Sequence, residues 1–123
     1  MWLTGLSSAK KAEKLPEEGS VVESGEKALS TNGASFEKGI PVYAPYGFVS
    51  IPPKSTDVLL IPCKNGTVCA GVKVDGSELK NGEVMIFSMS GAKIKLCRNG
   101  SVQINGVTIK SDGTVYAKDF IKE

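Results

Sequence analysis

Apolar and polar side chains alternate along the C-terminal third of the chain. Between Gly91 and Ser101 the apolar positions fall in one phase, whereas Lys93, Lys95 and Cys97 occupy the other. Asn-Gly and Asp-Gly dipeptides, which tolerate the positive φ of tight turns, follow at intervals of six and seven residues. The pattern predicts short antiparallel strands with one apolar face, formed by Ile94, Leu96, Val102, Ile104, Val107, Ile109 and Val115.

This apolar face is narrow and must be covered. A small isolated meander is marginally stable in water, and no amphipathic helix accompanies these strands in the sequence. Two arrangements remain: the sheet packs on the preceding part of the chain, or identical sheets from several chains enclose a common axis. The narrowness favours the second, because a sheet that packs on a barrel normally offers a broader face. We therefore predict a trimeric triangular prism with the seven apolar side chains at its axis and with protected strand edges.

Short β-type segments also fill the region from Phe36 to residue 90. Prolines, which are confined to strand edges and ends, and turn dipeptides such as Asn65-Gly66 separate them. The segments are Val42–Ala44, Gly47–Ile51, Val58–Ile61, Thr67–Val74 and Glu83–Ser88. Strands of this length and spacing predict a small β-barrel, for which the OB-like architecture is the nearest common form.

The first 35 residues are rich in Gly, Ser and Glu and contain few aromatic side chains. We expect an arm or linker there, with a short helix from Ser7 to Leu15 that ends at Pro16 and a weak strand around Val21–Val22. The predicted fold class is thus all-β. The predicted divisions are an arm (1–35), an OB-like barrel (36–90), a β-helical prism (91–118) and a tail (119–123).

The composition of the chain excludes several common catalytic mechanisms. The chain contains no histidine, so it cannot supply a Ser-His-Asp triad, a Cys–His pair or an imidazole metal ligand. Its candidate acids are not paired by any convincing spacing: Asp57, Asp75, Glu78 and Glu83. No phosphate-binding loop is present either. We predict that the chain is not an enzyme and has no catalytic, cofactor-binding or metal-binding residues.

The cysteines and charges indicate an ordinary intracellular product. Cys63, Cys69 and Cys97 are odd in number and form no Cys-x-x-Cys motif, which favours reduced thiols made in a cytoplasm. The phase of Cys97 directs it outward, away from a trimer axis, so we expect no shared metal there. Neither a membrane-spanning run nor a secretory signal is expected, and the net charge of +2 does not indicate a nucleic-acid partner.

A cluster of aromatic side chains suggests an alternative function, in which the chain binds a ligand. Tyr43, Tyr46 and Phe48 lie close together, and OB folds use aromatic platforms to bind oligosaccharides or nucleic acids. Prolines surround these aromatics and few lysines lie nearby, which favours a structural role. The basic side chains Lys93, Lys95 and Arg98 are interpreted in the same way, as the solvated outer face of a sheet.

An ordered set of short motifs resembles a known family. The set begins with Tyr46-Gly47-Phe48, followed by Ser50, a proline (Pro52 or Pro53) and the apolar stretch Asp57–Ile61. It continues with Leu79-Lys80-Asn81-Gly82-Glu83-Val84, Phe87-Ser88 and Gly91-Ala92-Lys93-Ile94, and the Asn-Gly and Asp-Gly repeats complete it. Across residues 43–117 this order resembles the phage baseplate assembly protein V family, the central spike proteins of contractile tails, in its transposable-phage-like branch.

The resemblance implies an OB-fold barrel followed by an intertwined trimeric β-helix. It also implies a structural role at the tail baseplate tip of a virion made in the bacterial cytoplasm. The implied partners are two further copies in a homotrimer, tail hub or baseplate proteins and, transiently, the target cell envelope, without nucleic acid. Family members often end in a His-x-His pair whose three copies bind iron. Because this chain has no histidine, we expect its trimer to be isolated without a bound transition metal.

Overall fold

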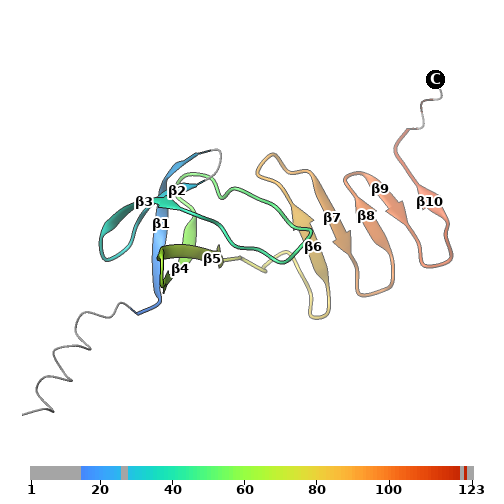
Figure 1. The fold of residues 1–123 in the computed structure, drawn as a ribbon. Helices are drawn as coiled ribbons and strands as arrows, with labels where there is room; N and C mark the ends of the chain where they lie inside the picture. The colour runs from blue at the N-terminus through green and yellow to red at the C-terminus, as the bar shows by residue number, and fades with distance from the viewer. Residues whose placement is uncertain (1–14, 26–27, 120, 122–123) are drawn as a thin grey trace, which may run out of the picture. The chain divides into compact units, whose positions relative to one another are not determined.

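The computed structural model describes residues 15–25, 28–119 and 121. Within this part the chain forms ten strands and no helix, which confirms the all-β class. The chain divides into two units, Met1–Val74 and Asp75–Glu123, and each unit holds one antiparallel sheet of five strands (Figure 1). The helix expected from Ser7 to Leu15 falls on residues outside the described part, apart from Leu15 itself.

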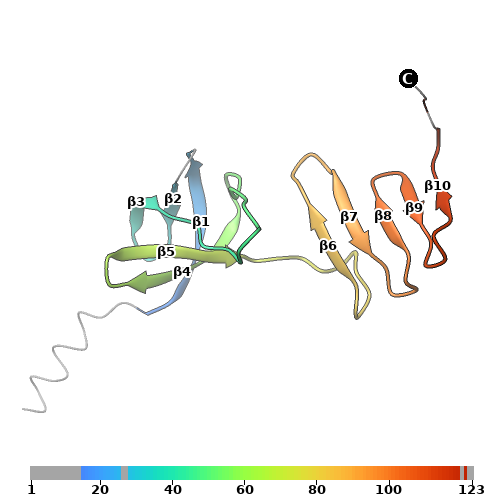
Figure 2. The same ribbon diagram turned by 45° about the vertical axis from the view of Figure 1, so that its right-hand side comes forward.

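The first sheet has the strand order β3-β2-β1-β4-β5. Its strands are β1 (Glu17–Ser24), β2 (Leu29–Asn32), β3 (Phe36–Ile40), β4 (Asp57–Cys63) and β5 (Gly66–Val72). The pairing register shifts within three of its strand pairs, β1–β2, β2–β3 and β4–β5. Such irregularities bend strands and increase their twist, and Figure 2 shows β4 and β5 turned across β1, β2 and β3.

The two outer strands of this sheet approach each other at one point. Val42, just beyond β3, forms an isolated parallel bridge with Cys69 of β5. The backbone N–H of Cys69 donates to the Pro41 carbonyl, and the N–H of Tyr43 donates to the Cys69 carbonyl, both at 2.9 Å. The sheet is therefore curled, and within the described residues a single bridge joins its edges, so it is not a closed barrel.

The core of the first unit lies inside this curl. Its buried apolar side chains come from all five strands: Val21, Leu29, Ile40, Val58, Leu60 and Cys69. Along β4 the alternation is clear, because Val58 and Leu60 are buried whereas Leu59 between them faces outward. Because the core is small, we expect each of its side chains to contribute to stability.

For its described part, the structure corrects the prediction that residues 1–35 form an arm or linker, whereas the strand expected around Val21–Val22 is confirmed within β1. Residues 17–24 and 29–32 are strands β1 and β2, β1 lies at the centre of the first sheet, and Val21 and Leu29 belong to the core. The segment looked like a linker because only alternate positions of a half-buried strand need be apolar. Its many polar residues occupy the outward positions.

The second sheet is a meander in which each strand pairs with the next. Its strands are β6 (Val84–Phe87), β7 (Lys93–Leu96), β8 (Val102–Ile104), β9 (Val107–Ile109) and β10 (Val115–Tyr116). The predicted boundary between residues 90 and 91 differs from the structure, where the second unit begins at Asp75. The reason is the pairing of β6 with β7, which includes Ile86 opposite Ile94.

The turns after β6, β7 and β9 repeat one hydrogen-bonding scheme. In each, a glycine N–H donates to the carbonyl three residues earlier: Gly91 to Ser88, Gly100 to Cys97 and Gly113 to Lys110. These glycines have φ of 94°, 89° and 90°, a region that side chains disfavour. At Gly100 space is also short, since a Cβ there would lie 3.2 Å from the Ser111 Cβ.

The turn between β8 and β9 is closed by an asparagine. Asn105 has a φ of 52°, which asparagine tolerates better than most residues. Its N–H donates to the Lys93 carbonyl at 3.0 Å, and its Oδ1 accepts from the Lys93 N–H at 3.0 Å. The side chain thus extends the pairing of β7 and β8 beyond the last strand residue.

Candidate interaction surfaces

The strand register places the predicted apolar residues on one face of the second sheet. Residues directly opposite each other in paired strands point to the same side, and the pairs Ile94–Ile104, Leu96–Val102 and Ile104–Val107 link three strands in this way. Further pairs add the two outer strands. The complete apolar face consists of Val84, Ile86, Ile94, Leu96, Val102, Ile104, Val107, Ile109 and Val115.

Two members of this apolar face were missed at the sequence level. Val84 and Ile86 belong to β6, whereas the sequence pattern predicts that residues 83–88 form part of the preceding barrel. They pair with Leu96 and Ile94, which puts them on the same side. The alternation of Val84 and Ile86 with Met85 and Phe87 was the available signal, but it did not say which sheet the strand joins.

The apolar face is largely open to solvent in the single chain. Val84, Ile86 and Val115 are 53%, 52% and 58% exposed, and Ile94 and Ile104 are each 40% exposed. Large contiguous apolar patches on soluble proteins mark interaction sites. The face is therefore the first candidate interaction surface, and it is the one that the sequence predicted from alternation alone.

The opposite face of the second sheet carries a mixture of polar, charged and apolar side chains. One row across it consists of Met85, Lys95, Gln103, Thr108 and Tyr116. The Lys110 ammonium lies 4.9 Å from the centre of the Tyr116 ring, a cation–π distance. Lys93 and Lys95 share this face, as predicted. Cys97 lies in the turn after β7, where it is half-buried.

Glu83 connects three parts of the second unit through its carboxylate. Oε1 accepts from the Lys80 N–H at 2.9 Å and lies 3.7 Å from the Lys95 Nζ, and Oε2 accepts from the Arg98 N–H at 2.9 Å. The side chain is 7% exposed. These two backbone hydrogen bonds, first that of Lys80 and then that of Arg98, lower the pKa of Glu83 from its ordinary value of 4.5, and Lys95 adds to the effect.

This carboxylate gives a pH-dependence with a definite sign. Because the pKa of Glu83 is lower in the folded chain, its contribution to stability is present above pH 4.5 and is lost as the pH falls through the lowered pKa. Glu83→Gln is expected to lower the urea midpoint at pH 7, and the deficit should shrink at pH 3. The exposed Glu78→Gln is the control and should leave both midpoints unchanged. An equal deficit for Glu83→Gln at both pH values would contradict the role of its charge.

The other candidate acids are not brought together into a catalytic arrangement. Asp75 Oδ1 accepts from the Ser77 N–H at 3.0 Å within its own turn, and Asp57 begins β4 in the other unit. Among the described residues, no group of three or more potential metal ligands occurs. Cys63 is exposed, Cys69 is buried in the core and all three thiols are free.

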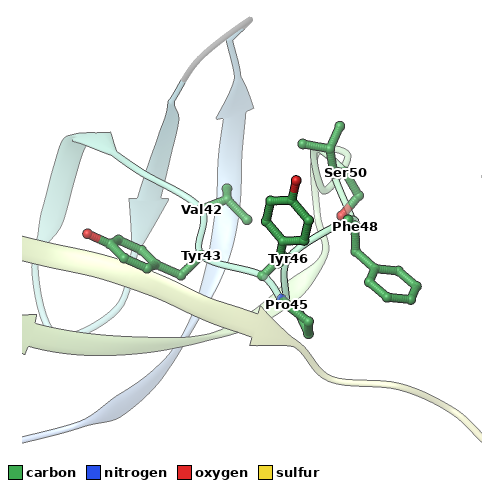
Figure 3. Close-up of a pocket in the computed structure, with 9 residues that line it drawn as sticks. Val42, Tyr43, Pro45, Tyr46, Phe48 and Ser50 are labelled. Carbon is green, nitrogen blue, oxygen red and sulfur yellow. The ribbon is translucent and has the colours of Figure 1, made fainter.

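The second candidate interaction surface is an aromatic loop, residues 41–51, between β3 and β4 (Figure 3). A strand was expected from Gly47 to Ile51, but the structure has none there. Instead the Phe48 N–H donates to the Pro45 carbonyl at 3.0 Å and Gly47 has a φ of 92°, which reverses the chain in a tight turn. The turn directs apolar side chains away from the sheet.

The aromatic loop is held firmly at both ends. At its start the Pro41 carbonyl and the Tyr43 N–H bond to Cys69 of β5. Just after it, the Ser24 hydroxyl donates to the carbonyl of Pro52 at 2.6 Å. A loop with these anchors and with proline-restricted φ presents its side chains in a fixed arrangement.

The side chains of the aromatic loop are exposed. Tyr46 and Val49 are fully exposed, at 103% and 99%, and Tyr43 and Phe48 are more than half exposed. No charged residue occurs from residue 39 to residue 53. The structure thus places the aromatics that the sequence singled out on one loop, outside the core of the first unit.

Comparison with models of known protein families found no match, and comparison with characterised proteins found none either. In the described part of the chain, no helix is long and apolar enough to cross a membrane.

Proposed function

We propose that this chain is a structural tail-spike or baseplate protein of a contractile injection device of a phage or prophage. Three copies form a rigid tip that pierces the target cell envelope. The observation that carries the proposal is the apolar face of the second sheet, which a single chain leaves exposed. The ordered motifs across residues 43–117, which resemble the central spike family, supply the biological setting.

The first unit supports the proposal through its strand order. Joining β3 to β5 at the Val42–Cys69 bridge gives the circular order β1-β2-β3-β5-β4, with β3 and β5 parallel. A five-stranded, partly open barrel of this order is the OB architecture. We propose that the curled first sheet is such a barrel, which in spike proteins precedes the tip.

The second unit supports a trimer through its shape. Its strands are only two to four residues long, so each presents one or two apolar side chains to the face. Three such sheets can enclose an apolar axis and leave Lys93, Lys95 and Gln103 in water. The chains then unfold and dissociate together, because the face is buried only in the assembly.

The proposed action is mechanical and uses no catalytic chemistry. A narrow prism transmits the force of tail contraction to a small area of the envelope. Its rigidity comes from short hydrogen-bonded strands, from turns fixed by Gly91, Gly100 and Gly113, and from the clamp at Glu83. The proposed partners are two copies of the chain and the tail hub or baseplate proteins at the virion tip.

A second candidate function is an OB-fold module that binds oligosaccharides or nucleic acids. The exposed Tyr43, Tyr46 and Phe48 favour it, since such modules stack ligands on aromatic rings. The aromatic loop lacks the charged side chains that would accompany such a site, because Lys54 is the first charge after it. This makes the binding module the weaker candidate.

Sedimentation velocity and small-angle scattering of the full chain test the proposed function. We expect an elongated trimer that persists on dilution and melts irreversibly at high temperature. A compact monomer at all concentrations would contradict the proposal and favour the binding module. Antibody labelling of contractile particles from the encoding host should then place the chain at the tail tip.

A further inference from the structure

The apolar face by itself is small for a stable interface between chains. Five strands spaced about 4.8 Å apart, with about three residues of 3.3 Å each, give a sheet area of roughly 240 Å². Specific stable interfaces bury about 800 Å² on each partner. Side chains project from the sheet, so the area that they can bury is larger than the area of the sheet itself. Even if it is twice as large, it is less than the area that a stable interface buries on each partner. A trimer built on it needs a second contact between copies.

The aromatic loop has the properties of that second contact. Residues 39–53 are the longest stretch of the chain without a charged side chain. Tyr46 and Val49 protrude fully, and aromatic residues are enriched at interface cores, where charged residues are depleted. Because its anchors at Cys69 and Ser24 already hold the loop, little conformational entropy is lost when it is covered.

We propose that the aromatic loop packs against the first units of the neighbouring copies of this chain, so that the trimer is joined at both of its units. This inference rests on the proposed trimer and adds to it a contact that the sheet face does not provide. The loop and the apolar face are both uncharged, so both suit a dry interface between identical chains.

Other occupants fit the aromatic loop less well. An oligosaccharide would require carboxylate or amide side chains beside the rings, and Ser50 carries the one polar, non-aromatic side chain between residues 41 and 51. A nucleic acid would require a basic surface. A hub protein of different sequence could also cover the uncharged aromatic loop. The contact between the copies of this chain would then still be limited to the apolar face, which is too small by itself.

The test uses the double variant Tyr46→Ser/Val49→Ser in the full chain. Both side chains are fully exposed in the single chain, so folding should be retained, as circular dichroism would verify. Sedimentation measures the fraction of assembled chain in urea. The urea concentration is the one at which half of the unaltered chain is assembled. We expect the chain concentration needed for half assembly to rise at least tenfold, which for a trimer is a 100-fold change in the dissociation constant, or about 2.8 kcal/mol per trimer.

Val74→Ser is the matched control, because Val74 is an exposed valine outside the aromatic loop and the apolar face. It should leave assembly unchanged. If the unaltered chain is a trimer and the double variant assembles equally well, the contact proposed for the loop is wrong, whereas the proposed function stands. If the double variant assembles normally but no longer joins the tail particle, the loop binds a hub protein instead. A monomeric unaltered chain overturns the proposed function itself.

Discussion

Ile104→Asp is expected to abolish trimer formation, whereas Gln103→Asp is expected to leave it intact. Residue 104 lies on the apolar face, opposite Ile94 and Val107, where three copies would bring three carboxylates together without counter-ions. Burying unpaired charge in this way is strongly unfavourable. Residue 103 lies on the opposite face beside Lys95, which would stabilise an added carboxylate.

Sedimentation velocity of the two variants provides the measurement. Ile104 is 40% exposed in the single chain, so its replacement should not prevent the chain itself from folding. The expected result is a folded monomer for Ile104→Asp and a trimer for Gln103→Asp. Equal trimer content in the two variants would contradict the assignment of the apolar face as the axis.

Leu60→Ala is expected to destabilise the chain by about 2–5 kcal/mol, the usual range for a buried leucine. Leu60 is fully buried at the centre of the first unit. Its Cδ1 lies 2.7 Å from the position that a Cβ would take on Gly19, so the side chain packs directly on the backbone of β1. The small core has few other atoms with which to fill the cavity.

Leu59→Ala is the matched control for this prediction. The two leucines are adjacent in β4, but Leu59 faces outward and is 43% exposed. Its truncation should cost about 1 kcal/mol or less. Urea unfolding at one fixed chain concentration measures both, because assembly makes stability depend on concentration. Similar losses for the two variants would show that β4 does not alternate as described.

Alternation made the second sheet predictable from the sequence. Strand residues point to opposite faces with a period of two, so Ile94, Leu96 and Ile104 reveal their common side without any knowledge of the fold. The turn dipeptides were equally informative, since Asn99-Gly100, Asn105-Gly106 and Asp112-Gly113 each lie in an observed turn. Both signals depend only on residues that are neighbours in the chain, so they can be recognised in a single sequence.

The membership of strands in sheets was less predictable. The stretch from Glu17 to Asn32 looked like a linker because its apolar positions are sparse, yet it supplies the central strand of the first sheet. Conversely, Gly47–Ile51 looked like a strand but forms an exposed loop. Whether a segment becomes a strand depends on the strands with which it can pair, which can be distant in the chain. The intrinsic β-propensity of its residues is a poor guide to that pairing.

The sequence by itself determined the all-β class, the absence of histidine chemistry and the apolar face from Ile94 to Val115, because composition and the two-residue period of a strand are properties of the chain alone. Only the tertiary structure decided that β1 and β2 complete the first core and that Val84 and Ile86 extend the apolar face. It also decided that Glu83 clamps two turns and that the aromatic loop lies in solvent. The place of β1 depends on its pairing with the distant β4, and the place of β6 on its pairing with β7 instead of with the first sheet. The sequence pattern of a strand does not specify which strand is its partner.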